Sequence, residues 1–433
     1  MTIDSATTGT GTTDTGTTDT GSESVHEFAA RARVWLAVNV PKATKHRAFV
    51  HGNDEEELAG VQRARDIQRT LFDGGFAGIC FPRAYGGQGL SHAHQRAFNA
   101  EAASYDMPSV LNVPTFVPCA AMLLEFGSEE QKLRHIPAIL RGEEIWMQFL
   151  SEPSGGSDVA GALTTAVRDG DEWIINGSKI WTTGAWFSDY GLCLLRTNWD
   201  VPKHSGLSVF IVEIDHPDME VQRIEMLNGS REFCQEYMLD MRVPDSARVG
   251  EVDDGWTIGR RWMFHERNAM GGGSPYTSGA PHGQEEVEGS EDPLFRLARS
   301  TGRLDDPRVQ EFLGEAVALR EAGKALSSRV GHGMASGYFT EAASGIARLM
   351  HAVVGERIVD IRLELAGASA AAWSESDAEA GVGTSYLMRQ TGSIGGGTTE
   401  MARNNISERM LGMPRERTLD KEVPFREVPK GPK

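Results

Sequence analysis

The chain has 433 residues, more than one compact core usually accommodates, so two or three subdomains are expected. Its formal net charge of −18 would repel polyanions over most of the surface, which argues against non-specific binding to nucleic acid or anionic membrane. The four cysteines are scattered without a CxxC pair, and no histidines cluster at metal-ligand spacing. The sequence therefore suggests neither a disulfide framework nor a metal site.

The N-terminal residues differ in composition from the rest. Residues 1–22 are mostly Thr, Gly, Ser and Asp, with too little apolar surface to offset the entropy of ordering, so we expect a disordered tail. They lack the basic and apolar regions of a signal peptide, and no run in the chain approaches the roughly 18 apolar residues of a membrane span. These features favour a cytoplasmic protein.

Residues 23–146 show helical periodicity, for example at Leu58, Val61, Ala64 and Ile67, which predicts an N-terminal helical domain. Between residues 147 and 250 the pattern changes to short strand-like runs separated by turn residues, which predicts a middle β domain. These runs are Trp173–Ile175, Leu192–Leu195 and Leu207–Val212.

The helical pattern returns in residues 251–433 and predicts a C-terminal helical domain, with long helices over 309–330 and 340–365. A Gly-rich and then acidic segment at 271–292 interrupts this pattern, and we interpret it as an irregular insertion between helices.

Two segments of the β region have compositions suited to ligand binding. Residues 148–158 read Gln-Phe-Leu-Ser-Glu-Pro-Ser-Gly-Gly-Ser-Asp, and such glycines and hydroxyls let backbone N–H groups approach an anionic or heteroaromatic ligand. Residues 176–185 read Asn-Gly-Ser-Lys-Ile-Trp-Thr-Thr-Gly-Ala. Taken alone, the first segment is more typical of a plain turn than of a binding site, and Trp181 is more typical of a core or strand-face aromatic than of a cofactor contact.

Together the two segments resemble the Thr/Ser-Glu-Pro-x-x-Gly-Ser-Asp and Trp-(Ile/Thr)-(Thr/Ser) motifs of the acyl-CoA dehydrogenase family, in the family's order and separation. The resemblance covers nearly everything after the tail and implies an α+β fold with an N-terminal helical domain, a β-barrel-like middle domain and a C-terminal helical bundle. Further matching segments are Phe126–Lys132, Arg242–Pro244, Gly255–Trp256, Ile394–Arg403 and Leu411–Pro414.

The resemblance also implies an FAD cofactor and the residues that hold it. Ser151 would meet the pyrimidine edge of the flavin and Thr183 would lie near its N5 atom. Ser157 would bind the substrate on its CoA side, and Arg267 would also bind the substrate. The expected FAD-binding residues are Phe149 and Leu150 through their backbone, Ser151, Trp181, Thr182 and Thr183 around the isoalloxazine, and Thr398 and Glu400 near the diphosphate or AMP portion.

The family places its catalytic Glu at one of two positions, and this chain carries a Glu at only one of them. Many members carry a Glu immediately before the Gly-Thr of the C-terminal loop, where this chain has Gly396, which retains only a backbone N–H for the enolate oxygen. A second subgroup, resembling isovaleryl-CoA and long-chain enzymes, places its Glu on the helix after Gly-Trp, where Glu266 precedes Arg267. Apolar neighbours would bury Glu266 and raise its pKa towards that of a useful base. An exposed Glu–Arg ion pair is the alternative.

The expected activity is α,β-dehydrogenation of an acyl-CoA thioester: Glu266 removes the α-proton while the flavin accepts the β-hydride, and electrons pass to an electron-transfer flavoprotein or similar acceptor. A homodimer or homotetramer is expected. Two alternatives stay open, an oxygen-using relative such as an acyl-CoA oxidase and a non-catalytic partner subunit. The second alternative stays open because the chain departs from the family pattern at Arg299–Arg303 and Leu363–Gly367. In the family, the elements at these positions help to bridge subunits at the FAD.

Overall fold

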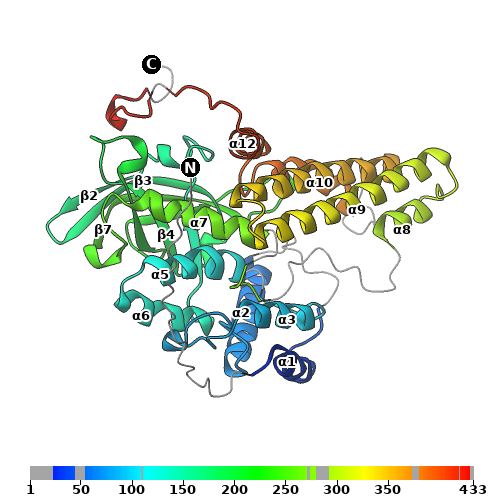
Figure 1. Cartoon of the computed structure of the whole chain (residues 1–433), viewed down its shortest axis with the longest axis horizontal. Coiled ribbons are helices and arrows are strands. Elements are labelled where there is room, and N and C mark those ends of the chain that lie inside the picture. Colours follow the sequence, from blue (N-terminus) through cyan, green and yellow to red (C-terminus); the bar gives the residue numbers. More distant parts are fainter. Residues whose placement is uncertain are drawn as a thin grey trace, which may run out of the picture.

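The computed structural model describes residues 23–43, 54–108, 111–270, 274–278, 292–372, 380–418 and 420–429. Within these ranges the chain has an α+β fold in which N-terminal helices and a central sheet form the body and long C-terminal helices extend from it (Figure 1). The predicted order of helical, β and helical regions is therefore confirmed. The expected tail at 1–22 and most of the expected insertion at 271–292 lie outside the described residues.

The N-terminal region is helical, and at the start of two of its helices a serine hydroxyl accepts a backbone N–H. The Ser24 hydroxyl accepts a hydrogen bond from the backbone N–H of Glu27, and Ser128 does the same for Gln131. The helices are α1 (Val25–Asn39), α2 (Asp54–Asp73), α3 (His92–Ala102), the π-helix η2 (Asn112–Ala120), α5 (Ala121–Phe126) and α6 (Glu129–Leu140).

In the middle region eight strands of the described chain form one mixed sheet, in the order β6-β7-β3-β2-β4-β5-β8 with β1 beside β4. Gly170, with φ 65°, makes the tight turn between β2 and β3. The predicted strand-like runs lie in β3, β4 and β5. The strands are β1 (Trp146–Phe149), β2 (Thr165–Asp169), β3 (Glu172–Thr183), β4 (Tyr190–Arg196), β5 (Leu207–Glu213), β6 (Met219–Arg223), β7 (Phe233–Pro244) and β8 (Arg248–Val249).

The C-terminal region begins with α7 (Gly255–Met270), which packs against α5, η2 and β5 and so lies between the N-terminal helices and the sheet (Figure 1). The helix predicted over 309–330 falls within α9 (Pro307–Ala335), and that predicted over 340–365 corresponds to α10 (Ser344–Ala366), which begins four residues later. These two helices run side by side away from the body (Figure 1). The remaining helices are α8 (Pro293–Ser300), α9 (Pro307–Ala335), α10 (Ser344–Ala366), α11 (Ala380–Met388), α12 (Thr399–Asn405) and the π-helix η10 (Ile406–Met410).

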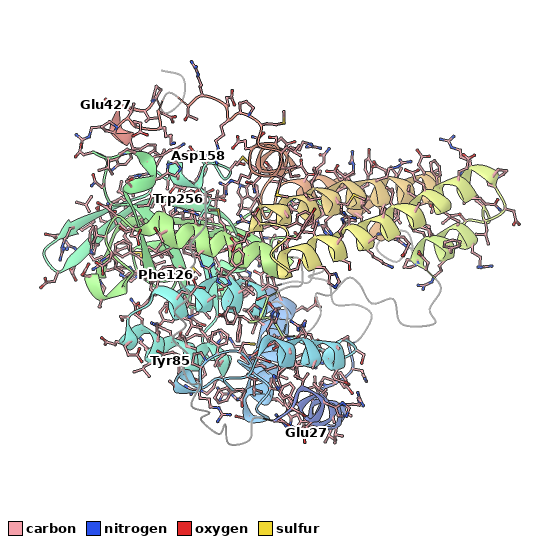
Figure 2. The ribbon with its side chains drawn as sticks, viewed as in Figure 1. Glu27, Tyr85, Phe126, Asp158, Trp256 and Glu427 are labelled. Atoms are coloured by element: carbon pink, nitrogen blue, oxygen red, sulfur yellow. The ribbon has the colours of Figure 1, made fainter. Side chains whose placement is uncertain are left out.

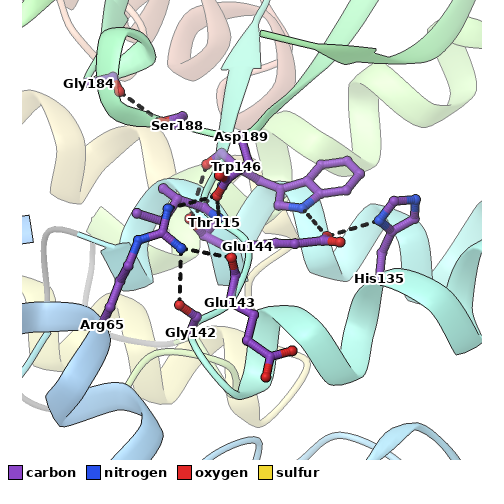
Figure 3. Close-up of polar contacts among 11 residues, drawn as sticks. Arg65, Thr115, His135, Gly142, Glu143, Glu144, Trp146, Gly184, Ser188 and Asp189 are labelled. Atoms are coloured by element: carbon purple, nitrogen blue, oxygen red, sulfur yellow. Dashed lines mark hydrogen bonds and ion pairs between the residues drawn. The ribbon is translucent and has the colours of Figure 1, made fainter. Parts of the chain in front are cut away.

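Arg65 of α2 joins the N-terminal helices to the sheet (Figure 3). Its guanidinium donates to the carbonyl oxygens of Gly142 at 3.2 Å and Glu143 at 2.7 Å, and to the carboxylate of Asp189 at 2.8 Å. The same carboxylate oxygen accepts the backbone N–H of Ile145 at 2.7 Å. One cation therefore ties the residues just before β1 to Asp189, the residue just before β4.

The first residue of β1 is held by contacts with two N-terminal helices (Figure 3). The Trp146 indole N–H donates to Glu144 at 2.9 Å, and His135 of α6 lies 2.9 Å from the same carboxylate oxygen. The Thr115 hydroxyl of η2 bonds both the N–H and the carbonyl of Trp146 at 3.1 Å. These contacts set the direction in which β1 leads to the ligand-binding segment.

Candidate active site

The two segments singled out in the sequence lie side by side at the ends of β1 and β3. The backbone N–H of Ile180 donates to the carbonyl of Ser151 at 3.0 Å. A Cβ atom at Gly156 would lie 3.2 Å from the Ser151 hydroxyl oxygen, so a side chain there would crowd that hydroxyl. Ser151 is half-buried, and its hydroxyl has no hydrogen bond within the described part of the chain. The hydroxyl is thus available to a ligand.

Trp181 stands out from β3 because the strand is irregular there. The pairing of β3 with β7 shifts register between Ile180 and Thr182, and Trp181 adopts a left-handed φ of 67°. Its side chain is 52% exposed, a large value for an indole, and the ring of Phe233 meets it edge-on with centroids 5.9 Å apart. Since positive φ is uncommon for a bulky residue, this conformation marks the bulge as a candidate binding feature.

The neighbours of Trp181 face different ways. Thr183 is half-buried beside it. Thr182 is buried, and its hydroxyl donates to the Glu236 carboxylate of β7 at 3.1 Å. The Thr182 side chain is thus used in packing within the β domain, so only its backbone could contact a cofactor.

The residues of this surface fit the isoalloxazine of FAD. An exposed indole, a free hydroxyl and closely approaching glycine backbone suit a planar heteroaromatic ring with polar edges. Phe149 is fully buried and Leu150 half-buried, so contacts from these two positions would come from the backbone, as the resemblance implies.

Glu266 of α7 faces β1, the strand that leads into the Ser151 segment. The amide nitrogen of Gln148 donates to Glu266 Oε1 at 3.3 Å, across 118 residues of sequence. Burial raises the pKa of Glu266, while the Gln148 hydrogen bond and the charge of Arg267 oppose the rise. Arg267 itself is exposed. Glu266 is thus half-buried, and Gln148 is its hydrogen-bond partner.

Gln148 has a role that reasoning from the sequence missed. Its side-chain oxygen accepts the indole N–H of Trp262 at 2.8 Å, so it bridges two residues of α7 that lie one turn apart. The available signal was a single amide among apolar residues in the strand Trp-Met-Gln-Phe. A half-buried polar side chain in such a strand calls for a partner, although the pattern does not say which one.

Ser157 lies at the outer end of the first segment, where its side chain is exposed. The neighbouring Asp158 forms an ion pair with Lys203, with Nζ 2.9 Å from Oδ2, and His204 packs edge-on against Trp256 at the start of α7. Figure 2 shows Asp158 and Trp256 on the side of the body over which the C-terminal residues, including Glu427, pass. Ser157 is therefore an exposed hydroxyl beside this ion pair, and its contact with the substrate stays a prediction.

The loop that carries Gly396 has a backbone that suits glycine. Gly396 and Gly397 have φ values of 69° and 94°, which side-chain-bearing residues rarely adopt. Arg348 of α10 donates to the carbonyl oxygens of Gly392 at 2.8 Å and Gly395 at 2.7 Å. The Gly395 carbonyl belongs to the peptide unit whose N–H is that of Gly396, so Arg348 orients this N–H.

Thr398 and Glu400 lie at the start of α12, directly after the glycines. Thr398 is the N-cap, and its hydroxyl accepts the backbone N–H of Met401 at 3.1 Å. Glu400 is exposed and accepts the Thr399 hydroxyl at 3.1 Å. In this structure both side chains make local contacts that stabilise the helix end.

Within the described ranges, no group of His, Cys, Asp and Glu side chains could hold a metal ion. In the same ranges, no helix combines the length and apolar character that crossing a membrane requires. The four cysteines are free thiols.

Family models match all three regions of the chain. The N-terminal domain of acyl-CoA dehydrogenases matches residues 23–143, the middle domain 148–240 and the C-terminal domain 295–411. The acyl-CoA dehydrogenase IpdE1 of Mycobacterium tuberculosis is 31% identical over 91% of this chain and 99% of its own length. The chain belongs to the acyl-CoA dehydrogenase family.

Solved structures agree with this assignment. A chain of the Tcur3481–Tcur3483 steroid ACAD is similar with a TM-score of 0.69 and 27% identity, over 90% of this chain and 98% of that one. A chain of the ChsE4–ChsE5 complex of M. tuberculosis has a TM-score of 0.67 and 26% identity, with coverage of 90% and 98%. The enzyme class expected from the sequence is therefore confirmed.

Proposed function

We propose that this enzyme dehydrogenates an acyl-CoA thioester between its α- and β-carbons, with FAD as cofactor and Glu266 as the base. The observation that carries the proposal is the position of the Glu266 carboxylate. It is partly buried against β1, the strand that continues directly into Ser151 and the surface that fits a flavin. Family membership supports the reaction class.

The chemistry divides between the cofactor and the chain. FAD when bound supplies the hydride acceptor, a role that no protein side chain fills. Glu266 takes the α-proton, and burial favours this role because it raises the carboxylate's affinity for a proton. The Gly396 N–H, oriented by Arg348, donates to the thioester oxygen as negative charge develops there.

The relatives suggest a substrate class and an assembly. Because two similar structures are a steroid ACAD and the two-component ChsE4–ChsE5 complex, we propose a bulky thioester as substrate and a second acyl-CoA dehydrogenase-like chain as partner. A copy of this chain would form the homodimer or homotetramer expected from the sequence, and a different chain a heteromer. Light scattering of the protein purified alone separates these arrangements, and a flavin-loaded monomer at micromolar concentration contradicts both.

The test of the reaction is anaerobic reduction of bound flavin by a panel of straight-chain and steroid-side-chain CoA thioesters. Glu266→Gln keeps the shape of the side chain but cannot accept a proton, so flavin bleaching should slow by roughly 100- to 10,000-fold while FAD stays bound. Glu321→Gln, at an exposed position on α9, is the matched control and should bleach as wild type does. A Glu266→Gln protein that bleaches within a few-fold of wild type refutes the assignment of the base.

Two further readouts address the alternatives. Heat-released cofactor should chromatograph as FAD. An oxidase-like enzyme would reoxidise rapidly in air with formation of hydrogen peroxide, whereas a dehydrogenase would need an electron-transfer flavoprotein or similar acceptor. A colourless protein that no thioester bleaches after reconstitution with FAD would be a non-catalytic subunit.

A further inference from the structure

We infer that Gln148 is a positioning residue for the base Glu266, and that Trp262 locks its amide in the orientation this requires. The inference rests on the proposed role of Glu266 and extends it to two residues that do not touch the reacting atoms. It starts from the pair of hydrogen bonds that the Gln148 amide makes with α7.

The two bonds determine which end of the amide faces Glu266. An indole N–H is only a donor, so the atom of Gln148 that lies 2.8 Å from Trp262 Nε1 must be the oxygen. The NH₂ group is then the end that reaches Glu266 Oε1 at 3.3 Å. A flipped amide would set donor against donor at the indole and acceptor against carboxylate at Glu266. Trp262 therefore enforces donation to the base.

The three residues are held by rigid elements. Trp262 is fully buried, and Gln148 is paired in register with Leu192 of β4. Trp262 and Glu266 are four residues apart on α7, so both face the strand from the same side of the helix. Gln148 stands three residues before Ser151, so it fixes the carboxylate relative to the surface that fits the flavin.

The same hydrogen bond sets the protonation of the base. Donation from a neutral amide favours the ionised carboxylate, whereas burial favours the protonated acid. The resulting pKa of Glu266 depends on both, and removal of Gln148 leaves burial unopposed by this bond. Gln148 thus keeps a buried base ionised at a lower pH than burial alone would allow.

Other charged groups around α7 are accounted for. Arg267 acts on Glu266 from its own helix, and Glu341 and Arg409 of the C-terminal region act on Arg267.

On the α5 side the charges are already paired. Glu125 accepts a hydrogen bond from Arg261 at 2.7 Å and lies 2.7 Å from His265.

Among the described residues, the other elements packed near α7 add no direct partner of Glu266. At the start of α7, His204 packs on Trp256. The η2 helix, Asn112–Ala120, brings no charged residue to this face. Gln148 is thus the direct partner whose removal isolates the effect.

The experiment measures anaerobic flavin reduction as a function of pH in the complete protein. Gln148→Met keeps the length and flexibility of the side chain without its hydrogen bonds. The rate rises with pH as the base ionises, and in this variant the midpoint should move to higher pH. At neutral pH the rate should fall about ten-fold, in keeping with a hydrogen bond to a charged group. FAD content and thioester Kd should stay within two-fold of wild type.

Trp262→Phe keeps most of the ring volume but lacks the indole N–H, so the amide is free to rotate. It should shift the midpoint in the same direction by a smaller amount, and it carries the test if Gln148→Met does not fold. Superimposable pH profiles for both variants and wild type overturn the inference. Failure of the proposed function looks different, because Glu266→Gln would then bleach at nearly the wild-type rate.

Discussion

The Nζ atom of Lys179 lies 2.8 Å from Oε1 of Glu152, with both side chains enclosed within the β domain. Lys179 also donates to the carbonyl oxygens of Leu194 at 2.6 Å and Leu150 at 3.3 Å. Burial would raise the pKa of Glu152, but the charge of Lys179 and hydrogen bonds such as that from Leu163 hold it below its ordinary value. The pair therefore anchors the Ser-Glu-Pro segment to β3.

Lys179→Met should strongly destabilise the protein. It leaves the Glu152 carboxylate buried without its cation, a situation that typically costs about 3–5 kcal/mol. Urea denaturation at neutral pH measures the loss. Lys324→Met is the control, because its pair with Glu321 is exposed on α9 and should contribute less than about 1 kcal/mol. Equal urea midpoints for Lys179→Met and wild type would show that the buried pair does not stabilise the fold.

Glu236 makes stability fall as pH rises. Burial raises its pKa to about 8 against the opposing hydrogen bond from Thr182, and its second oxygen has no partner within the described residues. Between the unfolded pKa, near 4.5, and the folded pKa, about 8, Glu236 holds a proton in the folded chain that it releases in the unfolded chain. The free energy of unfolding therefore decreases as pH rises through this range.

Glu236→Gln removes this ionisation. At pH 8.5 the variant should be more stable than wild type by a few kcal/mol, at about 1.4 kcal/mol per unit of pKa shift. At pH 5 the difference should be smallest. Urea midpoints at the two values measure the effect, with Glu220→Gln at an exposed position of β6 as control. If the urea midpoint of the wild type is no lower at pH 8.5 than at pH 5, the raised pKa of Glu236 is contradicted.

Ser157→Ala should weaken thioester binding several-fold, because one neutral hydrogen bond contributes about 0.5–1.5 kcal/mol. FAD content should not change. Isothermal titration with a non-reactive thioester analogue gives the Kd. Ser154→Ala, also exposed in the same segment, is the matched control and should bind as wild type does. An unaltered Kd for Ser157→Ala places the CoA portion elsewhere.

Phe425 attaches the C-terminal residues to the β domain. Its buried ring stacks on Trp199, with centroids 5.4 Å apart and planes at 17°, and lies 4.1 Å from the Arg196 guanidinium. Its backbone N–H donates to the carbonyl oxygen of Val201 at 2.9 Å.

Phe425→Ala should release residues 420–429 and speed tryptic cleavage after Lys421 at least ten-fold, while the sheet stays folded. Exposed Glu427→Ala should cleave at the wild-type rate, and equal rates for both variants refute the attachment.

The parts of the fold that could be predicted are those with local patterns. In α2, Val61, Ala64 and Ile67 are buried as their spacing predicts, whereas Leu58, in the same pattern, is 46% exposed. Strand β6 was not predicted. Its residues Met-Glu-Val-Gln-Arg alternate without any fully buried position, because among the described strands only β7 pairs with it, at the end of the strand order.

The candidate site divides in the same way. The hydroxyl, glycine and aromatic residues that suit a flavin lie in two short segments of the sequence, so their motifs could be recognised. The left-handed conformation of Trp181 could not, because it depends on a register shift against β7. The pairing of Gln148 with Glu266 also has no local signature, since it arises from packing of a helix on a strand far away in sequence. Long-range contacts of this kind require the structure.

The bonds of Arg65 have a consequence for how the enzyme comes apart on heating. Arg65 bonds both the end of the N-terminal helical region and the Asp189 carboxylate of the β region. If either region unfolds alone, it therefore leaves charged groups and carbonyl oxygens of the other region without hydrogen-bond partners. The two regions should therefore share one calorimetric transition, and the amides of α2 should exchange with solvent as slowly as those of β4.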